Sequence, residues 1–196
     1  MRVRLIYSKR NGACFVPHIA LAQIFARSAV RAGFSLMMTQ GFSPRAKLSF
    51  GPELPAGVVA LKEPADMYFS QAPENVITAM NSALPEGFMI SEAITVPDDA
   101  PSLGKSCKHA EYLLRSTNGS SLEDLAGEFF GEAVVLNERQ DDWLRVIISD
   151  PAQNPIGGFV KSLVNKNVIA GWHEINIVRV SIGTYDPLKG CVMMNA

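Results

Sequence analysis

The sequence predicts an α+β protein made of two ferredoxin-like units in tandem, each with the order β-α-β-β-α-β and a mainly antiparallel sheet. Strand-like and helix-like segments occur in that order twice along the 196 residues. A stretch rich in turn formers, residues 97–105, separates the two series. The content of 47% hydrophobic and 19% charged residues is typical of a folded soluble chain. We therefore expect one unit at residues 1–100 and a second at residues 105–196.

The first series opens with a strand at residues 1–8, where apolar side chains alternate with polar ones. A helix is expected at residues 17–32, because Pro17 suits a first helical turn and Gly33 suits the stop. Apolar residues also recur there at three- and four-residue steps. The further elements expected in this half are strands at residues 34–39, 47–50, 65–70 and 88–96 and a helix at residues 73–83.

The second series repeats this order, although the two halves share no obvious residue-level identity. The repeat is therefore inferred from the order of the elements alone. The elements expected here are strands at residues 109–116, 133–138, 143–149 and 174–185 and helices at residues 121–130 and 157–167.

Residues 39–58, TQGFSPRAKLSFGPELPAGV, are the most unusual stretch, with three glycines and three prolines. Glycine gives the backbone freedom and proline fixes φ, so we expect tight, defined turns. Two interpretations remain open. In the functional one, a rigid cationic loop presents Arg45, Lys47 and the ring of Phe42 to an anionic or nucleotide-like partner. In the structural one, these residues form a corner whose cations are solvated.

The charge is distributed unevenly along the chain. Residues 1–50 contain eight cations and no acid, a net charge of +8. The other residues hold the remaining 10 of 18 cations and all 19 acids, a net charge of −9. A basic half attracts polyanions or acidic protein surfaces, so RNA and an acidic partner are both candidate ligands.

A motif pattern in the first third of the chain indicates a family. The residues that form it are His18, Arg27, Arg31, Ala32, Gly33, Gln40, Gly41, Phe42, Ser43, Pro44, Lys47, Leu48, Ser49, Phe50, Leu54, Pro55 and Gly57. Over about residues 1 to 70 the chain resembles the bacterial radical SAM-linked protein family. Members of that family occur fused to a cobalamin-type radical SAM protein or as its separate partner, and their own domain has no established activity. The resemblance therefore implies a radical SAM protein as partner.

Two positions depart from that family. Cys14 and Ala20 stand where the resemblance leads us to expect an arginine shortly before His18 and an aspartate two residues after it. A polar site built on those two residues would be incomplete in this chain. The residues that we expect to contact a ligand or RNA are His18, Arg27, Arg31, Gln40, Phe42, Arg45, Lys47 and Ser49.

No cofactor or metal is expected. The three cysteines, Cys14, Cys107 and Cys191, are too far apart in sequence for a metal-ligand motif. The closely spaced cysteines that hold a radical SAM cluster do not occur, so the chain is not itself that enzyme. We expect Trp143 and Trp172 to pack against apolar neighbours rather than to stack on bases.

These observations favour a non-catalytic accessory protein that binds RNA, such as tRNA or rRNA, or a partner enzyme. One alternative is a metal-independent endoribonuclease similar to the CRISPR repeat-cleaving enzymes, with His18 as the base and Arg45 or Lys47 stabilising the phosphorane. A second alternative is a pure protein adaptor.

Because no apolar run reaches the length of a membrane span and no signal peptide is evident, we expect a cytoplasmic protein. The oligomeric state stays open.

Overall fold

The first half of the chain supplies four strands, two helices and one short 3-10 helix. The computed structural model describes residues 1–194. The elements of this half are β1 (Arg2–Lys9), η1 (Asn11–Phe15), α1 (His18–Arg31), β2 (Leu48–Phe50), β3 (Val59–Tyr68), α2 (Val76–Ala83) and β4 (Phe88–Val96). β1 pairs antiparallel with both β3 and β4, and β2 pairs antiparallel with β3.

The second half repeats the order of strands and long helices and adds a terminal strand. Its elements are α3 (Leu103–Ser106), β5 (His109–Ser116), α4 (Glu123–Phe130), η2 (Gly131–Ala133), β6 (Val134–Gln140), β7 (Trp143–Ser149), α5 (Ile156–Asn165), η3 (Trp172–Glu174), β8 (Ile175–Asp186) and β9 (Cys191–Met193). β5 pairs antiparallel with β7 and β8, and β6 pairs antiparallel with β7. None of the helices described here has the length and apolar character needed to cross a bilayer.

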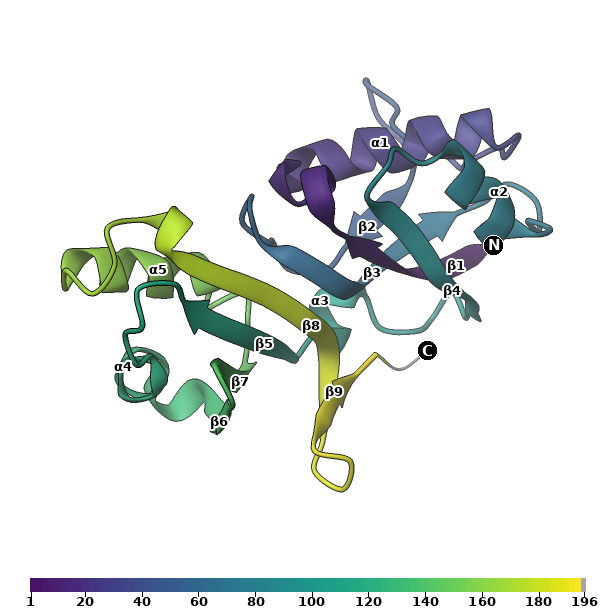
Figure 1. Ribbon diagram of the computed structural model, residues 1–196. Coiled ribbons are helices and arrows are strands. Elements are labelled where there is room, and N and C mark those ends of the chain that lie inside the picture. Colours follow the sequence, from purple (N-terminus) through teal and green to yellow (C-terminus); the bar gives the residue numbers. More distant parts are fainter. Residues whose placement is uncertain (195–196) are drawn as a thin grey trace.

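The strands of both halves join in one sheet with the order β4-β1-β3-β8-β5-β7-β6, while β2 lies beside β3 and β9 beside β8 (Figure 1). The halves meet where β3 and β8 run parallel over two residue pairs, Val59 with Val178 and Ala60 with Arg179. The other ladders are antiparallel, so the predicted α+β class with mainly antiparallel pairing is confirmed. The assignment to two ferredoxin-like units and the boundary near residue 100 stay predictions.

Each half buries one face of its sheet under two helices. Leu21, Phe25 and Ala29 lie on one stripe of α1 and pack with α2 on the strands of the first half. In the second half, α4 and α5 cover the sheet in the same way, with Phe130 and Phe159 in the core. Removal of this apolar surface from water is the main stabilising contribution in both places.

Two expectations about the first half are corrected. Residues 34–39 do not form a regular strand but make only two isolated bridges, Leu36 with Phe69 and Met38 with Ala46. After Met38 the chain leaves the sheet in a narrow hairpin, so no continuous ladder can form. Residues 97–105 do more than separate the halves, because Leu103 is buried in the core of the second half.

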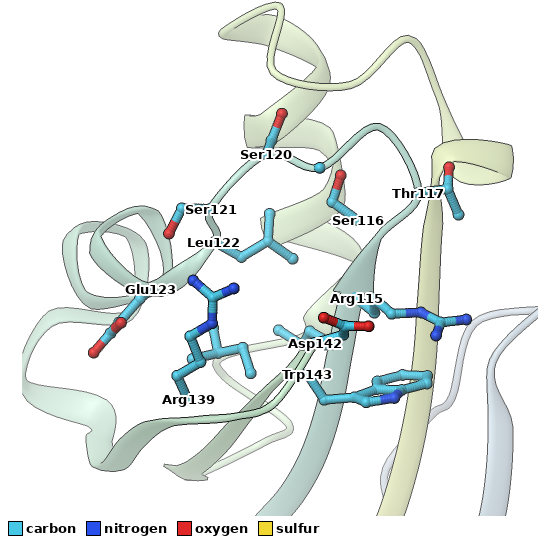
Figure 2. A pocket seen from close by; sticks show the side chains of 13 residues that line it. Arg115, Ser116, Thr117, Ser120, Ser121, Leu122, Glu123, Arg139, Asp142 and Trp143 are labelled. Carbon is cyan, nitrogen blue, oxygen red and sulfur yellow. The ribbon is translucent and has the colours of Figure 1, made fainter.

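The second half also carries an open cavity. It lies where β5 ends, α4 begins and the turn between β6 and β7 reverses the chain, and Figure 2 shows it from close by. Its volume is about 310 Å³. On the face of the sheet away from α4 and α5, β9 pairs with β8 and forms a strap across the strands.

Candidate functional site

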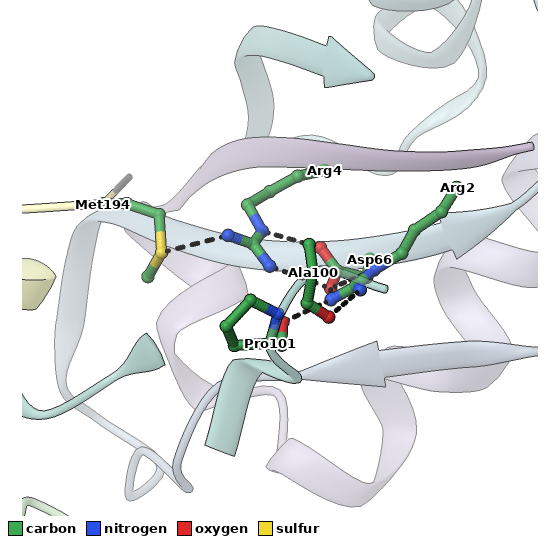
Figure 3. Close-up of polar contacts among 6 residues, drawn as sticks. All are labelled: Arg2, Arg4, Asp66, Ala100, Pro101 and Met194. Atoms are coloured by element: carbon green, nitrogen blue, oxygen red, sulfur yellow. Dashed lines mark hydrogen bonds and ion pairs between the residues drawn. The ribbon is translucent and has the colours of Figure 1, made fainter. Parts of the chain in front are cut away.

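Three of the eight cations in residues 1–50 lie inside the protein. Arg2, Arg4 and Lys9 are each at most 3% exposed. Arg2 Nε lies 3.0 Å from Asp66 Oδ2, and Arg4 Nε lies 2.8 Å from Asp66 Oδ1 (Figure 3). Burial of a guanidinium without a counter-charge would cost several kcal/mol, so the shared carboxylate is what makes the arrangement possible. The basic character of the sequence therefore overstates the basic character of the surface.

A loop from between the two halves covers this buried ion pair. Arg2 donates to the carbonyl oxygens of Ala100 and Pro101, each at 2.8 Å, and Arg4 Nη1 lies 3.7 Å from the sulfur of Met194. The alternation predicted along β1 gives the strand one mostly polar face, which carries Arg2 and Arg4. That face is enclosed, however, because residues 97–106 and Met194 lie across it.

The remaining cations of this region are Arg10, Arg27, Arg31, Arg45 and Lys47, and all of them are exposed. Arg31 has a structural contact as well, because its guanidinium donates to the carbonyl of Ala83 at 2.7 Å and so ties the last turn of α1 to the end of α2. Lys47 Nζ lies 4.2 Å from the centre of the Tyr68 ring, a cation–π contact that anchors the lysine to β3.

Residues 37–47 form a narrow hairpin, which we call the 37–47 hairpin. Its arms are joined by hydrogen bonds from Thr39 N to Arg45 O at 2.7 Å and from Lys47 N to Met37 O at 2.7 Å. Arg45 N also donates to Thr39 Oγ1 at 3.0 Å. The tip carries Gln40 and Phe42, and the Phe42 side chain is completely exposed. The tight turns predicted for this stretch therefore hold an aromatic ring out in solvent.

An apolar groove of about 850 Å³ runs between the base of this hairpin and the end of α1. Val30 and Met38 are 69% and 54% exposed along it. Arg27 and Arg31 project from α1 at its edge, so we call it the cation-rimmed groove. Its lining residues are Ala26, Arg27, Val30, Arg31, Gly33, Phe34, Ser35, Leu36, Met38 and Ala46.

His18 occupies a different environment from the hairpin. Its ring contacts Phe50 edge to face, with 6.0 Å between ring centres. Burial lowers the pKa of His18, so the ring is neutral at neutral pH. The charged groups that act on the ring belong to the junction between the halves, and they are Glu53, Arg179, Glu63 and Lys9.

Ser49 also lies away from the groove. It sits on β2 opposite Asp66 of β3, on the same face of the sheet as the buried arginine pair, while Leu48 and Phe50 pack against the first core. Polar and apolar side chains thus alternate between the two faces of this strand. The structure groups Arg27 and Arg31 at the groove, places Gln40, Phe42, Arg45 and Lys47 on the adjoining hairpin, and keeps His18 and Ser49 apart from them.

A buried charged cluster at the junction was missed by sequence reasoning. Arg179 Nε of β8 lies 2.7 Å from Glu63 Oε1 of β3, across the parallel pairing that joins the halves. Lys9 Nζ donates to the carbonyl of Val16 at 3.1 Å, and burial lowers the pKa of this lysine. The three side chains lie more than 50 positions apart in sequence, and no local pattern links them.

No cluster of three potential metal ligands occurs within residues 1–194. Cys14 and Cys107 are buried, and burial raises the pKa of Cys107 to about 12. Its thiol is therefore protonated at neutral pH and a poor nucleophile.

Comparison with known families gives one match. A family described as "Uncharacterized protein conserved in bacteria" (DUF2344) matches residues 2–145. The matched segment contains α1, the 37–47 hairpin and all the residues that line the cavity in the second half. The description names no activity, radical SAM protein or RNA. No curated protein matches the sequence.

Proposed function

The chain belongs to this uncharacterised bacterial family, DUF2344, and on that premise we propose that it is a non-catalytic, cytoplasmic accessory protein. It binds a protein partner through the cation-rimmed groove and the 37–47 hairpin. The observation that carries the proposal is the gathering of exposed apolar side chains there, with Val30, Met38 and Phe42 all more than half exposed.

Exposed apolar side chains that stand singly are common on proteins, but a group around a groove is typical of an interaction surface. Phe42 at a hairpin tip is an aromatic anchor of the kind that dominates binding energy at interfaces. The hydrogen bonds between Thr39 and Arg45 fix the hairpin before binding, so little conformational entropy is lost on docking.

The rim of the groove defines the chemistry of the partner. Arg27 and Arg31 flank an apolar floor, so the complementary segment has apolar side chains on one side and carboxylates beside them. An amphipathic acidic helix meets both requirements. The resemblance of residues 1 to 70 to radical SAM-linked proteins supplies the candidate partner, a cobalamin-type radical SAM protein.

We also propose that each half is a ferredoxin-like unit, with the boundary between residues 100 and 105. The support is the order of pairing. β1 lies between β3 and β4 in the first half, and β5 lies between β7 and β8 in the second, with β2 and β6 on the outer sides of β3 and β7. This is the order expected when two split βαβ units share an antiparallel sheet.

Binding to the purified radical SAM protein of the same bacterium, measured by isothermal titration calorimetry, tests the proposal. Phe42→Ala should weaken the complex by about tenfold or more, because an anchoring aromatic contributes about 2 kcal/mol or more. Leu188→Ala is the matched control, since Leu188 is equally exposed but lies in the second half between β8 and β9. Equal affinity of the two variants, or no binding by the wild type, would contradict the proposal.

A charge-reversal pair tests the rim separately. Arg27→Glu should weaken binding and reduce its dependence on salt, whereas Arg10→Glu should leave both close to the wild type. Arg27 is the better choice than Arg31, because Arg31 also holds the end of α2. If Arg27→Glu and Arg10→Glu weaken binding equally, the affinity depends on the overall surface charge and not on the rim of the groove.

RNA is the second candidate ligand, and Phe42 beside Arg45 is the observation that favours it. An exposed ring can stack on a base while a neighbouring arginine contacts phosphate. Burial of Arg2, Arg4 and Lys9 removes three of the cations on which a polyanion-binding face would depend. Fluorescence anisotropy with tRNA at several salt concentrations decides the point, because phosphate contacts produce a steep loss of affinity with salt.

Cleavage of that RNA in the presence of a chelator, if it is lost in the variant His18→Ala, would instead favour the endoribonuclease.

A further inference from the structure

The cavity in the second half is built from residues that neither the sequence motifs nor the partner-binding surface uses. Arg115 from β5, Arg139 from β6 and Trp143 from β7 line it together with the loop at residues 116–122. Figure 2 shows the side chain of Arg139 extending toward the loop that carries Ser120 and Ser121. Two strands thus each place an arginine in the lining of the cavity, and Figure 2 shows the two guanidinium groups on opposite sides of Asp142.

Both arginines are available to a ligand. Arg145, on the neighbouring strand, is engaged by Glu111 and Glu138. In contrast, Arg115 and Arg139 form no ion pair anywhere in the described part of the chain. Arg139 donates from Nε to the carbonyl of Asp141 at 3.0 Å, a bond that fixes its base and leaves the terminal nitrogens for another acceptor.

Arg115 is held in place by a cation–π contact with the Trp143 ring and not by an ion pair. Its guanidinium carbon lies 4.7 Å from the centre of the Trp143 ring. A cation–π contact holds the guanidinium over the ring without using its N–H groups, which stay available as donors. Such an arrangement suits an oxyanion, because the fork geometry of arginine matches phosphate and carboxylate oxygens.

The other polar groups restrict the class of anion. Asp142 lies at the same opening and would repel a bare phosphate, but its carboxylate accepts hydrogen bonds from hydroxyl groups. Ser120 and Ser121 add hydroxyls that serve as either donor or acceptor. The volume of about 310 Å³ is at the lower end for small-molecule sites, which run from about 300 to 1,000 Å³.

The geometry points to a binding site for a small phosphate ester that carries free hydroxyl groups, such as a sugar phosphate or a mononucleotide. Arg139 binds the phosphate, Asp142 accepts from a hydroxyl of the sugar, and Arg115 borders the opening on the other side of Asp142, over the Trp143 ring. This site is separate from the partner-binding groove and lies in the other half of the molecule.

Trp143 provides a direct readout, because the chain has only two tryptophans. Trp172→Phe leaves Trp143 as the single fluorophore, with Arg115 over its ring. Titration of this variant with ribose 5-phosphate and with AMP should give a saturable change in emission, and inorganic phosphate should bind more weakly. Calorimetry with the wild type checks the same ligands without a fluorophore. Tighter binding of AMP than of ribose 5-phosphate would identify a nucleotide, and equal binding a sugar phosphate.

Variants of the lining residues make the test specific. Arg139→Gln in the Trp172→Phe background should weaken binding of either ester by about tenfold or more. Asp142→Ala should weaken the esters while strengthening inorganic phosphate, because it removes both the hydroxyl acceptor and the repelling charge. Arg10→Gln, in the first half, is the control and should leave binding unchanged. The absence of a saturable response to both esters, or a response that Arg139→Gln does not weaken, would overturn the assignment.

Discussion

In the first half of the molecule, the polar face of the sheet is sealed, whereas in the second half the matching face stays partly open to water. Residues 97–106 cover the first face, and Arg2 and Arg4 share Asp66 there in an ion pair that is almost completely buried. On the second face, Arg145 pairs with Glu111 beneath the β9 strap and remains 16% exposed. Its other partner, Glu138, is 42% exposed.

This difference shows that the net charge of a sequence segment does not give the charge that the segment exposes on the protein surface. The strand alternation in β1 and in β5 looks alike, with one apolar face and one polar face. The two polar faces differ in what covers them. A loop whose backbone carbonyls accept hydrogen bonds from Arg2 lies over β1, whereas only the short strand β9 lies over β5. The first half therefore uses its N-terminal arginines for folding, which leaves the groove and the hairpin for the proposed binding.

The largest expected effect comes from breaking the sealed pair. Asp66→Asn leaves two guanidinium groups inside the protein without a counter-charge and should lower the free energy of unfolding by about 3–5 kcal/mol. Urea denaturation at neutral pH measures this. Glu138→Gln serves as the control in the open pair, with an expected loss of about 1 kcal/mol or less. Similar losses in the two variants would show that the first pair is not sealed.

A smaller effect is expected from the open face. Glu111→Gln removes the charge that meets Arg145 Nε at 2.8 Å and weakens the bond from Val192 N that holds the β9 strap. The loss should be about 1–3 kcal/mol, because Arg145 keeps Glu138 and some water. Urea denaturation gives the value, and cleavage by trypsin at Lys189 reports release of the strap. A loss as large as that of Asp66→Asn would remove the contrast between the two faces.

The smallest effect is on the pH dependence of stability, to which each half contributes one histidine. Burial lowers the pKa of His18 and of His109 in the folded protein, so the unfolded chain binds these protons more readily. Their contribution to stability is complete above the ordinary histidine pKa of about 6.5 and is lost as the pH falls through the folded values. His18→Gln and His109→Gln should each lose less stability than the wild type between about pH 6.5 and 5. An unchanged loss on acidification would contradict the burial of that ring.

Much of the fold was predictable because local pattern and tertiary structure agree. The helix expected at residues 17–32 is α1, His18–Arg31, and the strands expected at residues 88–96 and 109–116 coincide with β4 and β5. In these segments the apolar period matches the face that meets the core, so sequence alone suffices. Residues 34–39 have the apolar content of a strand but bridge the sheet only at Leu36 before the chain turns into the hairpin, and they form the groove wall and one arm of the hairpin.

The sites were harder to predict, for a physical reason. Arg27, Arg31, Phe42, Arg45 and Lys47 lie close in sequence, and the hairpin with its adjoining helix end keeps them in one region. Arg115 and Arg139 both line the cavity in the second half, but they are far apart in sequence. Only the pairing of β5, β7 and β6 brings both of them to it. Trp143 was expected only to pack against apolar side chains, yet one face of its ring holds Arg115.

Hydrogen–deuterium exchange of the chain, alone and with its proposed partner, a cobalamin-type radical SAM protein, tests the central claim most directly, because it locates the bound surface. The account predicts slower exchange on binding in residues 27–47, which contain the end of α1 and the 37–47 hairpin, and little change in the strands around the cavity of the second half. Protection confined to other segments, or no protection at concentrations where the two proteins form a complex, would contradict it.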